Sequence, residues 1–204
     1  TGSAKRCDIS LRKRIPMGAG LGGGSSDAAA VLRGLNAGCG NICSAGELRQ
    51  IAATLGSDIP FFLGDGPARC TGRGEIIGEA GVEIGPMEIL LVKPPFGVST
   101  PDAYERWAGS EEIDGIDYAP QSVGNLELVS DLERPVFEKF LLLADLKTWL
   151  REQSGVKAAL LSGSGATVFA VLSGEGPGLE GDLRREFGES LWIERTSVLP
   201  TLSP

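Results

Sequence analysis

The sequence contains no histidine among its 204 residues. This absence excludes Ser-His-Asp and Cys-His catalytic arrangements and most zinc sites, so acid–base chemistry must use carboxylates, lysines or water. The four cysteines form no C-x-x-C pair, and a chain of this length needs no disulfides to be stable. We therefore expect free thiols at Cys7, Cys39, Cys43 and Cys70, with a metal or redox site as the alternative.

Long apolar runs and excess positive charge are also lacking. No run approaches the roughly 20 apolar residues that span a membrane, and the first residues carry no signal-peptide core. The net charge of −8 argues against a broad nucleic-acid surface. With 42% hydrophobic residues, the composition is that of a soluble globular protein of one large or two small domains, which we expect to be cytoplasmic.

Glycine, in contrast, is abundant, and five glycines crowd into residues 18–24 of the segment 16–27, PMGAGLGGGSSD. Without side chains, this glycine loop (residues 16–26) can turn sharply and bring N–H groups close to an anion. Ser25, Ser26 and Asp27 are suited to cap the helix that follows, whose N-terminus favours negative charge. The segment is neither a Walker A loop nor a Rossmann fingerprint. We predict a nucleotide-phosphate site, the alternative being a purely structural loop.

The hydrophobic pattern predicts alternating strands and helices, and hence an α+β sandwich. A domain boundary is expected in the glycine- and proline-containing stretch 78–86, and a mobile polar loop over 109–121. A helix is expected to start with Thr100 as its cap and Pro101 in its first turn. The expected strands are 9–15, 68–75, 88–92, 156–161, 166–172 and 191–194, and the other expected helices are 26–35, 44–55, 137–150 and 179–187.

Three further segments carry candidate chemistry. Asp58, in GSDIPFF (56–62), stands before an apolar cluster, where desolvation and a nearby cation would set its proton affinity, although taken alone it fits a helix cap better. The small residues of SGSG (162–165) allow close approach to the glycine loop, with a plain hairpin turn as the alternative. Tyr104 suits either stacking on a planar base or a place in the core.

Taken together and in this order, these segments resemble the motifs of the GHMP kinases, which include galactokinase and the homoserine, mevalonate and phosphomevalonate kinases. In that family the glycine loop wraps the triphosphate of ATP. The resemblance implies an α+β architecture of two domains. Residues 1–86 would be the remainder of the N-terminal ATP-binding domain, which resembles the second domain of ribosomal protein S5, and 87–204 a ferredoxin-like C-terminal domain.

The aspartate segment and PPFGVSTPDAY (94–104) are most similar to the GHMP kinases that phosphorylate the 2-hydroxyl of a methylerythritol linked to cytidine diphosphate, in non-mevalonate isoprenoid biosynthesis. This similarity implies ATP and Mg²⁺ as cofactors and a small-molecule substrate, with no nucleic-acid or membrane partner, in a monomer or homodimer. Another GHMP kinase, of the mevalonate or homoserine type, and a non-catalytic nucleotide-binding module are the alternatives.

The resemblance also implies roles for single residues. Asp58 would accept the proton of the attacking hydroxyl, and Ser25 or Ser26 would reach the metal ion. The substrate would contact Pro101, Tyr104, Ser162 and Gly163, with Tyr104 stacked on cytosine. Ser130 replaces an asparagine of the family, which leaves its role open. The residues expected to bind ATP phosphates are Pro16, Gly18, Ala19, Gly20, Leu21, Gly22, Gly23, Gly24, Ser25 and Ser26.

The family's first motif, similar to Ala-Lys-Ile-Asn-Leu, has no counterpart here. Ala4 and Lys5 are followed by Arg6 and Cys7 and lie too close to the glycine loop. Truncation of a normal enzyme and a naturally shorter protein both explain this, and we favour the first. Because the motif's lysine would be missing, we expect little or no kinase activity from this chain alone. Turnover by a preparation shown by intact mass to begin at Thr1 would contradict this.

Overall fold

The structure is a computed structural model that describes residues 6–174 and 178–198. The chain divides into two compact units. Among the described residues, the first unit contains 6–16 and 22–83, and the second contains 17–21, 84–174 and 178–198. The sequence pattern did not predict that the first half of the glycine loop, residues 17–21, belongs with the second unit.

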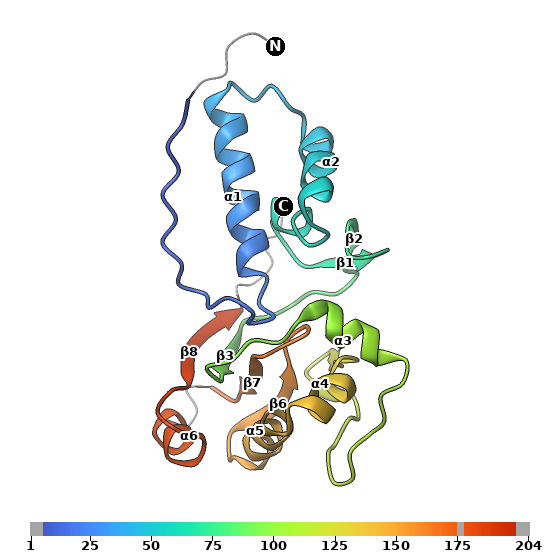
Figure 1. Ribbon diagram of the computed structural model, residues 1–204, viewed down its shortest axis with the longest axis vertical. Helices are drawn as coiled ribbons and strands as arrows, with labels where there is room; N and C mark the ends of the chain where they lie inside the picture. Colours follow the sequence, from blue (N-terminus) through green and yellow to red (C-terminus); the bar gives the residue numbers. More distant parts are fainter. Residues whose placement is uncertain (1–5, 175–177, 199–204) are drawn as a thin grey trace. The chain divides into compact units, whose positions relative to one another are not determined.

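The first unit is built mainly from helices. It contains α1 (Gly23–Gly38), α2 (Ala45–Leu55), the 3₁₀ helix η1 (Phe61–Leu63) and a hairpin of β1 (Ala68–Thr71) and β2 (Ile76–Glu79) (Figure 1). Helix α2 begins at the predicted capping box, in which the Ser44 hydroxyl accepts from the Glu47 N–H and the Glu47 carboxylate accepts from the Ser44 N–H. The core of this unit consists of Ala29, Ala52 and Ile59, with Phe62 and Leu63 packed against it.

Two predictions for the first unit were wrong. Residues 9–15 form no strand, and no described strand pairs with them. An alternating pattern alone does not provide the partner whose N–H and C=O groups a strand requires. Helix α1 begins at Gly23, earlier than predicted, because Gly22 caps it in the left-handed conformation. Ser25 and Ser26 therefore lie inside the first turn, and no side chain caps the helix.

The second unit is built around a four-stranded antiparallel sheet in the order β6-β7-β3-β8. In the central strand β3, Leu90 pairs with Ala170 of β7 on one side and with Arg195 of β8 on the other. A separate small hairpin joins β4 to β5. The elements of this unit are β3 (Met87–Lys93), α3 (Thr100–Trp107), β4 (Gln121–Val123), β5 (Leu126–Leu128), α4 (Glu133–Lys139), α5 (Leu141–Glu152), β6 (Val156–Leu161), β7 (Val168–Leu172), α6 (Glu180–Phe187) and β8 (Trp192–Val198).

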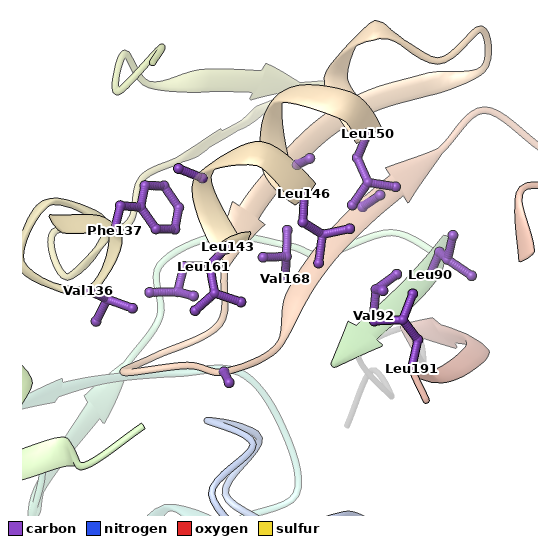
Figure 2. Close-up of a cluster of buried hydrophobic side chains, with 14 of the residues drawn as sticks. Leu90, Val92, Val136, Phe137, Leu143, Leu146, Leu150, Leu161, Val168 and Leu191 are labelled. Carbon is purple, nitrogen blue, oxygen red and sulfur yellow. The ribbon is translucent and has the colours of Figure 1, made fainter. Parts of the chain in front are cut away.

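Apolar side chains cover both faces of this sheet. Successive residues of β6 alternate, so that Ala159 and Leu161 join the cluster beneath the helices and Ala158 and Leu160 join a second cluster with Val123 of β4. Figure 2 shows the first cluster, in which side chains of α4 and α5 meet those of β6 and β7. The strand predicted over 88–92 is confirmed as β3, and the sheet that contains it is covered by apolar side chains on both faces.

The α+β class is confirmed, with three local differences in the second unit. The single helix predicted over 137–150 is interrupted at Phe140, which has φ −130° and ψ 71° and stacks on Phe96 with ring centroids 5.2 Å apart. Ser99, not Thr100, accepts the capping hydrogen bond of α3. Strand β8 continues to Val198, because it pairs with the whole length of β3. Among the described residues, no helix is long and apolar enough to cross a membrane.

Candidate active site

The first half of the glycine loop has an alternating backbone conformation. Gly18, Gly20 and Gly22 have φ of 60°, 70° and 63°, whereas Ala19 and Leu21 between them are not in the positive-φ region. Such alternation turns successive N–H groups toward one concavity, an arrangement called a nest that binds anions. The glycines at alternate positions are therefore required by the conformation that a phosphate site needs.

The carbonyl groups of this half-loop are held by the turn between β6 and β7. Gly18 O accepts from Ala166 N at 3.1 Å, Ala19 O accepts from Thr167 N at 3.2 Å, and Gly20 O accepts from the Ser162 hydroxyl at 2.9 Å. The N–H groups of residues 18–22, in contrast, donate to no acceptor within 6–174 and 178–198. The loop is thus fixed through its carbonyls while its donors stay available.

The close packing of this loop also explains its glycines. A Cβ on Gly20 would lie 2.1 Å from Ser162 O, and one on Gly18 would lie 3.2 Å from the Cα of Gly97. The SGSG segment is a hairpin turn, as the alternative interpretation held, and it also lies directly against the glycine loop within the second unit. Both descriptions of that segment apply.

The second half of the glycine loop forms the first turn of α1 in the first unit. The Ser26 hydroxyl donates to Gly23 O at 2.9 Å, whereas the half-buried Ser25 hydroxyl has no partner in the described part of the chain. The Lys13 ammonium lies 2.5 Å from an Asp27 carboxylate oxygen and 3.2 Å from where a Cβ of Gly23 would stand. An ion pair therefore lies beside the start of α1, which the sequence did not indicate although Lys13 shortly precedes the loop.

The segment that carries Asp58 packs against this second half-loop. Ile59 and Pro60 are buried, and the Phe62 ring lies so close to Gly22 that a Cβ there would be 2.5 Å from the ring. Asp58 itself is exposed, caps no helix and forms no ion pair with the described residues. Its Oδ1 lies 3.2 Å from the Cβ position of Gly74, in the turn between β1 and β2.

The second unit contains an open cavity of about 640 Å³. Tyr104 and Trp107, three residues apart on α3, both line it and are 65% and 45% exposed, which excludes the core position considered for Tyr104. Ser162 and Gly163 line the same cavity, whereas Pro101 does not. The sequence analysis missed Trp107, although its spacing from Tyr104 is the signal that could have identified it. The other lining residues are Val129, Ser130, Asp131, Leu132, Leu161 and Phe169.

Within residues 6–174 and 178–198, cysteine and acidic residues form no cluster that could hold a metal ion. Cys7, Cys39, Cys43 and Cys70 are all free thiols, as predicted. In the part of the chain that the structure describes, no group of three or more Cys, Asp or Glu side chains could hold a metal ion. A metal ion bound here would therefore be held largely by the phosphate groups of a ligand.

A glycine loop in a nest conformation that leads into a helix, with a carboxylate on a segment packed against the loop, is typical of kinases that act on small molecules. Residues 1–66 match the family model of the GHMP kinases N-terminal domain, and residues 120–187 match that of the GHMP kinases C-terminal domain. The chain therefore belongs to the GHMP kinase family, whose members use ATP.

A 4-diphosphocytidyl-2-C-methyl-D-erythritol kinase from Methylacidiphilum infernorum is 42% identical over 197 residues, which cover 94% of this chain and 68% of the relative. One from Protochlamydia amoebophila is 41% identical and covers 87% of this chain and 60% of the relative. The crystal structure of a 4-(cytidine 5'-diphospho)-2C-methyl-D-erythritol kinase is 31% identical, with a TM-score of 0.63, over 90% of this chain and 68% of that one. The chain thus spans about 60–70% of the length of these relatives. Within the GHMP kinases it belongs to the 4-diphosphocytidyl-2-C-methyl-D-erythritol kinases, and the predicted resemblance is confirmed.

Proposed function

We propose that this chain provides the phosphate loop, the catalytic carboxylate and the cytidine pocket of an enzyme that transfers the γ-phosphoryl group of ATP to the 2-hydroxyl of 4-diphosphocytidyl-2-C-methyl-D-erythritol, in non-mevalonate isoprenoid precursor biosynthesis. The observation that carries the proposal is the row of N–H groups over residues 18–22 that have no acceptor among the described residues. The names of the relatives favour this substrate over those of mevalonate and homoserine kinases, and favour an enzyme over a non-catalytic module.

The glycine loop binds the phosphate groups of ATP in this proposal. Residues 18–22 donate backbone N–H groups to phosphate oxygens, and the first turn of α1 adds free N–H groups and the positive end of its dipole. Pro16 leads the chain into the loop. Lys13 lies beside Gly23 but is paired with Asp27, so in this proposal the backbone N–H groups, and not a lysine charge, attract the phosphate groups.

Asp58 acts as the base. Its carboxylate accepts the proton of the 2-hydroxyl as that oxygen forms a bond to the γ-phosphorus, while the bond to the bridging oxygen of ATP breaks and ADP leaves. Phosphoryl transfer depends mainly on positioning and charge neutralisation, so one carboxylate is sufficient. The buried Ile59 and Pro60 fix the backbone beside Asp58, which supports a defined position for an exposed side chain.

The cavity in the second unit binds the cytidine part of the substrate. Tyr104 stacks on cytosine and Trp107 offers a second aromatic surface, because aromatic faces suit planar bases. Ser162 and Gly163 contact the substrate from the opposite part of the lining. Pro101, in the first turn of α3, supports the position of Tyr104 from within the same helix rather than lining the cavity.

Magnesium would be bound together with the phosphate groups and would neutralise their charge. The residues present fit such an ion, because Ser25 has a hydroxyl without a partner in the described residues at the start of α1, and hydroxyl oxygen is a ligand that Mg²⁺ accepts. Of the two predicted ligands we therefore favour Ser25 over Ser26, whose hydroxyl donates to Gly23 O. We further propose a cytoplasmic monomer or homodimer without a nucleic-acid partner.

Replacement of Asp58 tests the chemical step. We expect Asp58→Asn, in enzyme expressed from the complete coding region, to lower kcat by about 10²–10⁴-fold, the usual contribution of a general base, without weakening ATP binding. Asp65→Asn, at an exposed acid shortly after η1, is the matched control and should leave kcat unchanged. Normal turnover by the Asp58 variant would remove this residue from the mechanism.

Competition by nucleotides tests the substrate class. Cytidine diphosphate should compete with substrate for the chain, as measured by isothermal titration calorimetry, because the pocket is assigned to the cytidine group. Mevalonate and homoserine should not compete. Binding of either of these in place of cytidine diphosphate would favour the alternative kinases.

A further inference from the structure

Two oppositely charged side chains are buried within the second unit. Glu133, the first residue of α4, and Lys147 of α5 are each 2% exposed, and the Lys147 Nζ lies 2.6 Å from Glu133 Oε2. Burying such a pair rarely adds net stability, because removing two charges from water costs about as much as their attraction returns. The pair therefore requires a reason other than stability.

Each member of the pair also holds a piece of backbone. Glu133 Oε1 accepts a hydrogen bond from the Leu161 N–H at 2.9 Å, and Lys147 donates to the carbonyl of Asp117. The Lys147 ammonium also lies over the rings of Tyr118 and Phe137, 5.4 and 5.9 Å from their centroids. Burial raises the pKa of Glu133, and the hydrogen bond from Lys147 opposes that rise.

These backbone contacts lead directly to the candidate active site. Leu161, held by Glu133, lines the cavity together with Ser162 and Gly163, and Leu132 beside Glu133 lines it as well. The Ser162 hydroxyl in turn donates to Gly20 O in the glycine loop. A continuous series of hydrogen bonds and adjacent residues thus connects Glu133, through residues 161 and 162, with the first half of the phosphate loop.

We propose that Glu133, held in place by Lys147, is a positioning residue that fixes the segment 161–163 and thereby sets both the wall of the substrate cavity and the position of the Gly20 carbonyl. The effect of Glu133 on ligand binding rests on the cytidine pocket that we propose as part of the function. The effect of Glu133 on the backbone at Leu161 does not depend on that pocket, so the two effects can be tested separately.

Two double variants separate the hydrogen bond from the charge. Glu133→Gln with Lys147→Met removes both charges but keeps a carbonyl oxygen that can accept from Leu161 N–H, whereas Glu133→Leu with Lys147→Met removes the acceptor too. We expect the leucine variant to exchange the amide hydrogens of Leu161 and Ser162 about tenfold or more faster than the glutamine variant, because one hydrogen bond is lost. Its Kd for cytidine diphosphate should be raised by about tenfold, while the glutamine variant stays close to the unchanged protein.

A third variant measures the effect of destabilisation alone. Leu183→Ala opens a space in the same hydrophobic core, on α6, and Leu183 does not line the cavity. It should lower Tm and leave the Kd for cytidine diphosphate unchanged at temperatures well below the transition. An increase in Kd as large as that of the leucine variant would show a general effect of instability and would overturn the positioning role.

The remaining outcomes are also decisive. Equal amide exchange at Leu161 and Ser162 in the two double variants would overturn the proposal. The leucine variant could exchange faster while neither the variants nor the unchanged protein bind cytidine diphosphate. That result would support the positioning of segment 161–163 by Glu133 and would overturn the assignment of the cavity to cytidine.

Discussion

The glycines of the glycine loop differ in whether a side chain would fit at their positions. Gly20 has φ +70° and a Cβ there would lie 2.1 Å from Ser162 O, whereas a Cβ on Gly24, inside α1, would meet nothing within 4 Å. We expect Gly20→Ala to lower the free energy of unfolding by about 3 kcal/mol or more, from backbone strain and overpacking together. Gly24→Ala should raise it by up to about 1 kcal/mol, because alanine favours helix. Urea denaturation of the two variants measures the difference, and equal effects would contradict the close packing of the loop.

The aromatic pair of α3 should control affinity for the base. Trp107→Leu and Tyr104→Leu should each raise the Kd for cytidine diphosphate by about tenfold, since stacking of one base on one ring contributes about 1–3 kcal/mol. Leu141→Ala, at an exposed apolar residue that does not line the cavity, is the control and should leave Kd unchanged. Calorimetric titration distinguishes these results. If Tyr104→Leu alone weakens binding, Trp107 has no part in the pocket.

Single residues also show where sequence reasoning reached its limit. Segment 94–104 was enough to predict a cytosine contact for Tyr104. The role proposed for Trp107 depends instead on a cavity that residues 129–132 and 161–163 also line. The sequence did not point to Lys13, because this lysine precedes the loop, whereas a Walker A lysine would lie inside it. Its approach to Gly23 is visible only once the chain before the loop is placed beside α1.

Among the strands, β3 ends in a buried lysine that should make stability depend on pH. Lys93 is 5% exposed, and its ammonium donates to Pro94 O at 2.9 Å and to Phe96 O at 2.7 Å. Burial lowers the pKa of Lys93 below its ordinary value of 10.5. At pH values between the lowered pKa of Lys93 in the folded chain and its ordinary pKa in the unfolded chain, the unfolded chain binds more protons. The contribution of Lys93 to stability therefore increases as pH rises through this range.

Comparison with Lys93→Met isolates this effect. The free energy of unfolding of the unchanged protein, minus that of the variant, should increase from about pH 7 to about pH 10, as measured by urea denaturation at several pH values. A difference that falls with pH would show that charging Lys93 stabilises the fold, contrary to the direction of its pKa.

Elements whose signals are local were predicted well. The capping box at Ser44 and the apolar run 88–92 carry their signals in adjacent residues, and α2 and β3 lie where expected. The single helix predicted over 137–150 was wrong, because Phe140 leaves the helical conformation. Its ring packs on Phe96, a residue far away in sequence. Helix α1 follows Gly22, a cap residue in the left-handed conformation. The sequence rule that places a serine at the cap does not predict this start.

The two units differ in how much apolar surface they bury. Among the described residues, the buried core of the first unit is Ala29, Ala52 and Ile59, whereas the second unit contains two larger clusters on either side of its sheet. Local stability follows buried apolar contacts, so central amides of α1 and α2 should exchange hydrogen faster than those of β3 and β7. Exchange followed by mass spectrometry tests this, with residues in the first turn of each helix left out. Slower exchange in α1 than in β3 would contradict it.

Much about this chain could be inferred from the order of its residues: an α+β fold, free cysteines and membership of the GHMP kinases. Those conclusions depend on short segments whose composition already limits the backbone or the chemistry. The assignment of residues 17–21 to the second unit, the contacts that hold their carbonyls, the cavity beside Trp107 and the buried Glu133–Lys147 pair became visible only in the folded chain. Each joins residues that are distant in sequence, and the burial, shape and hydrogen bonds that connect such residues arise only when the chain is packed.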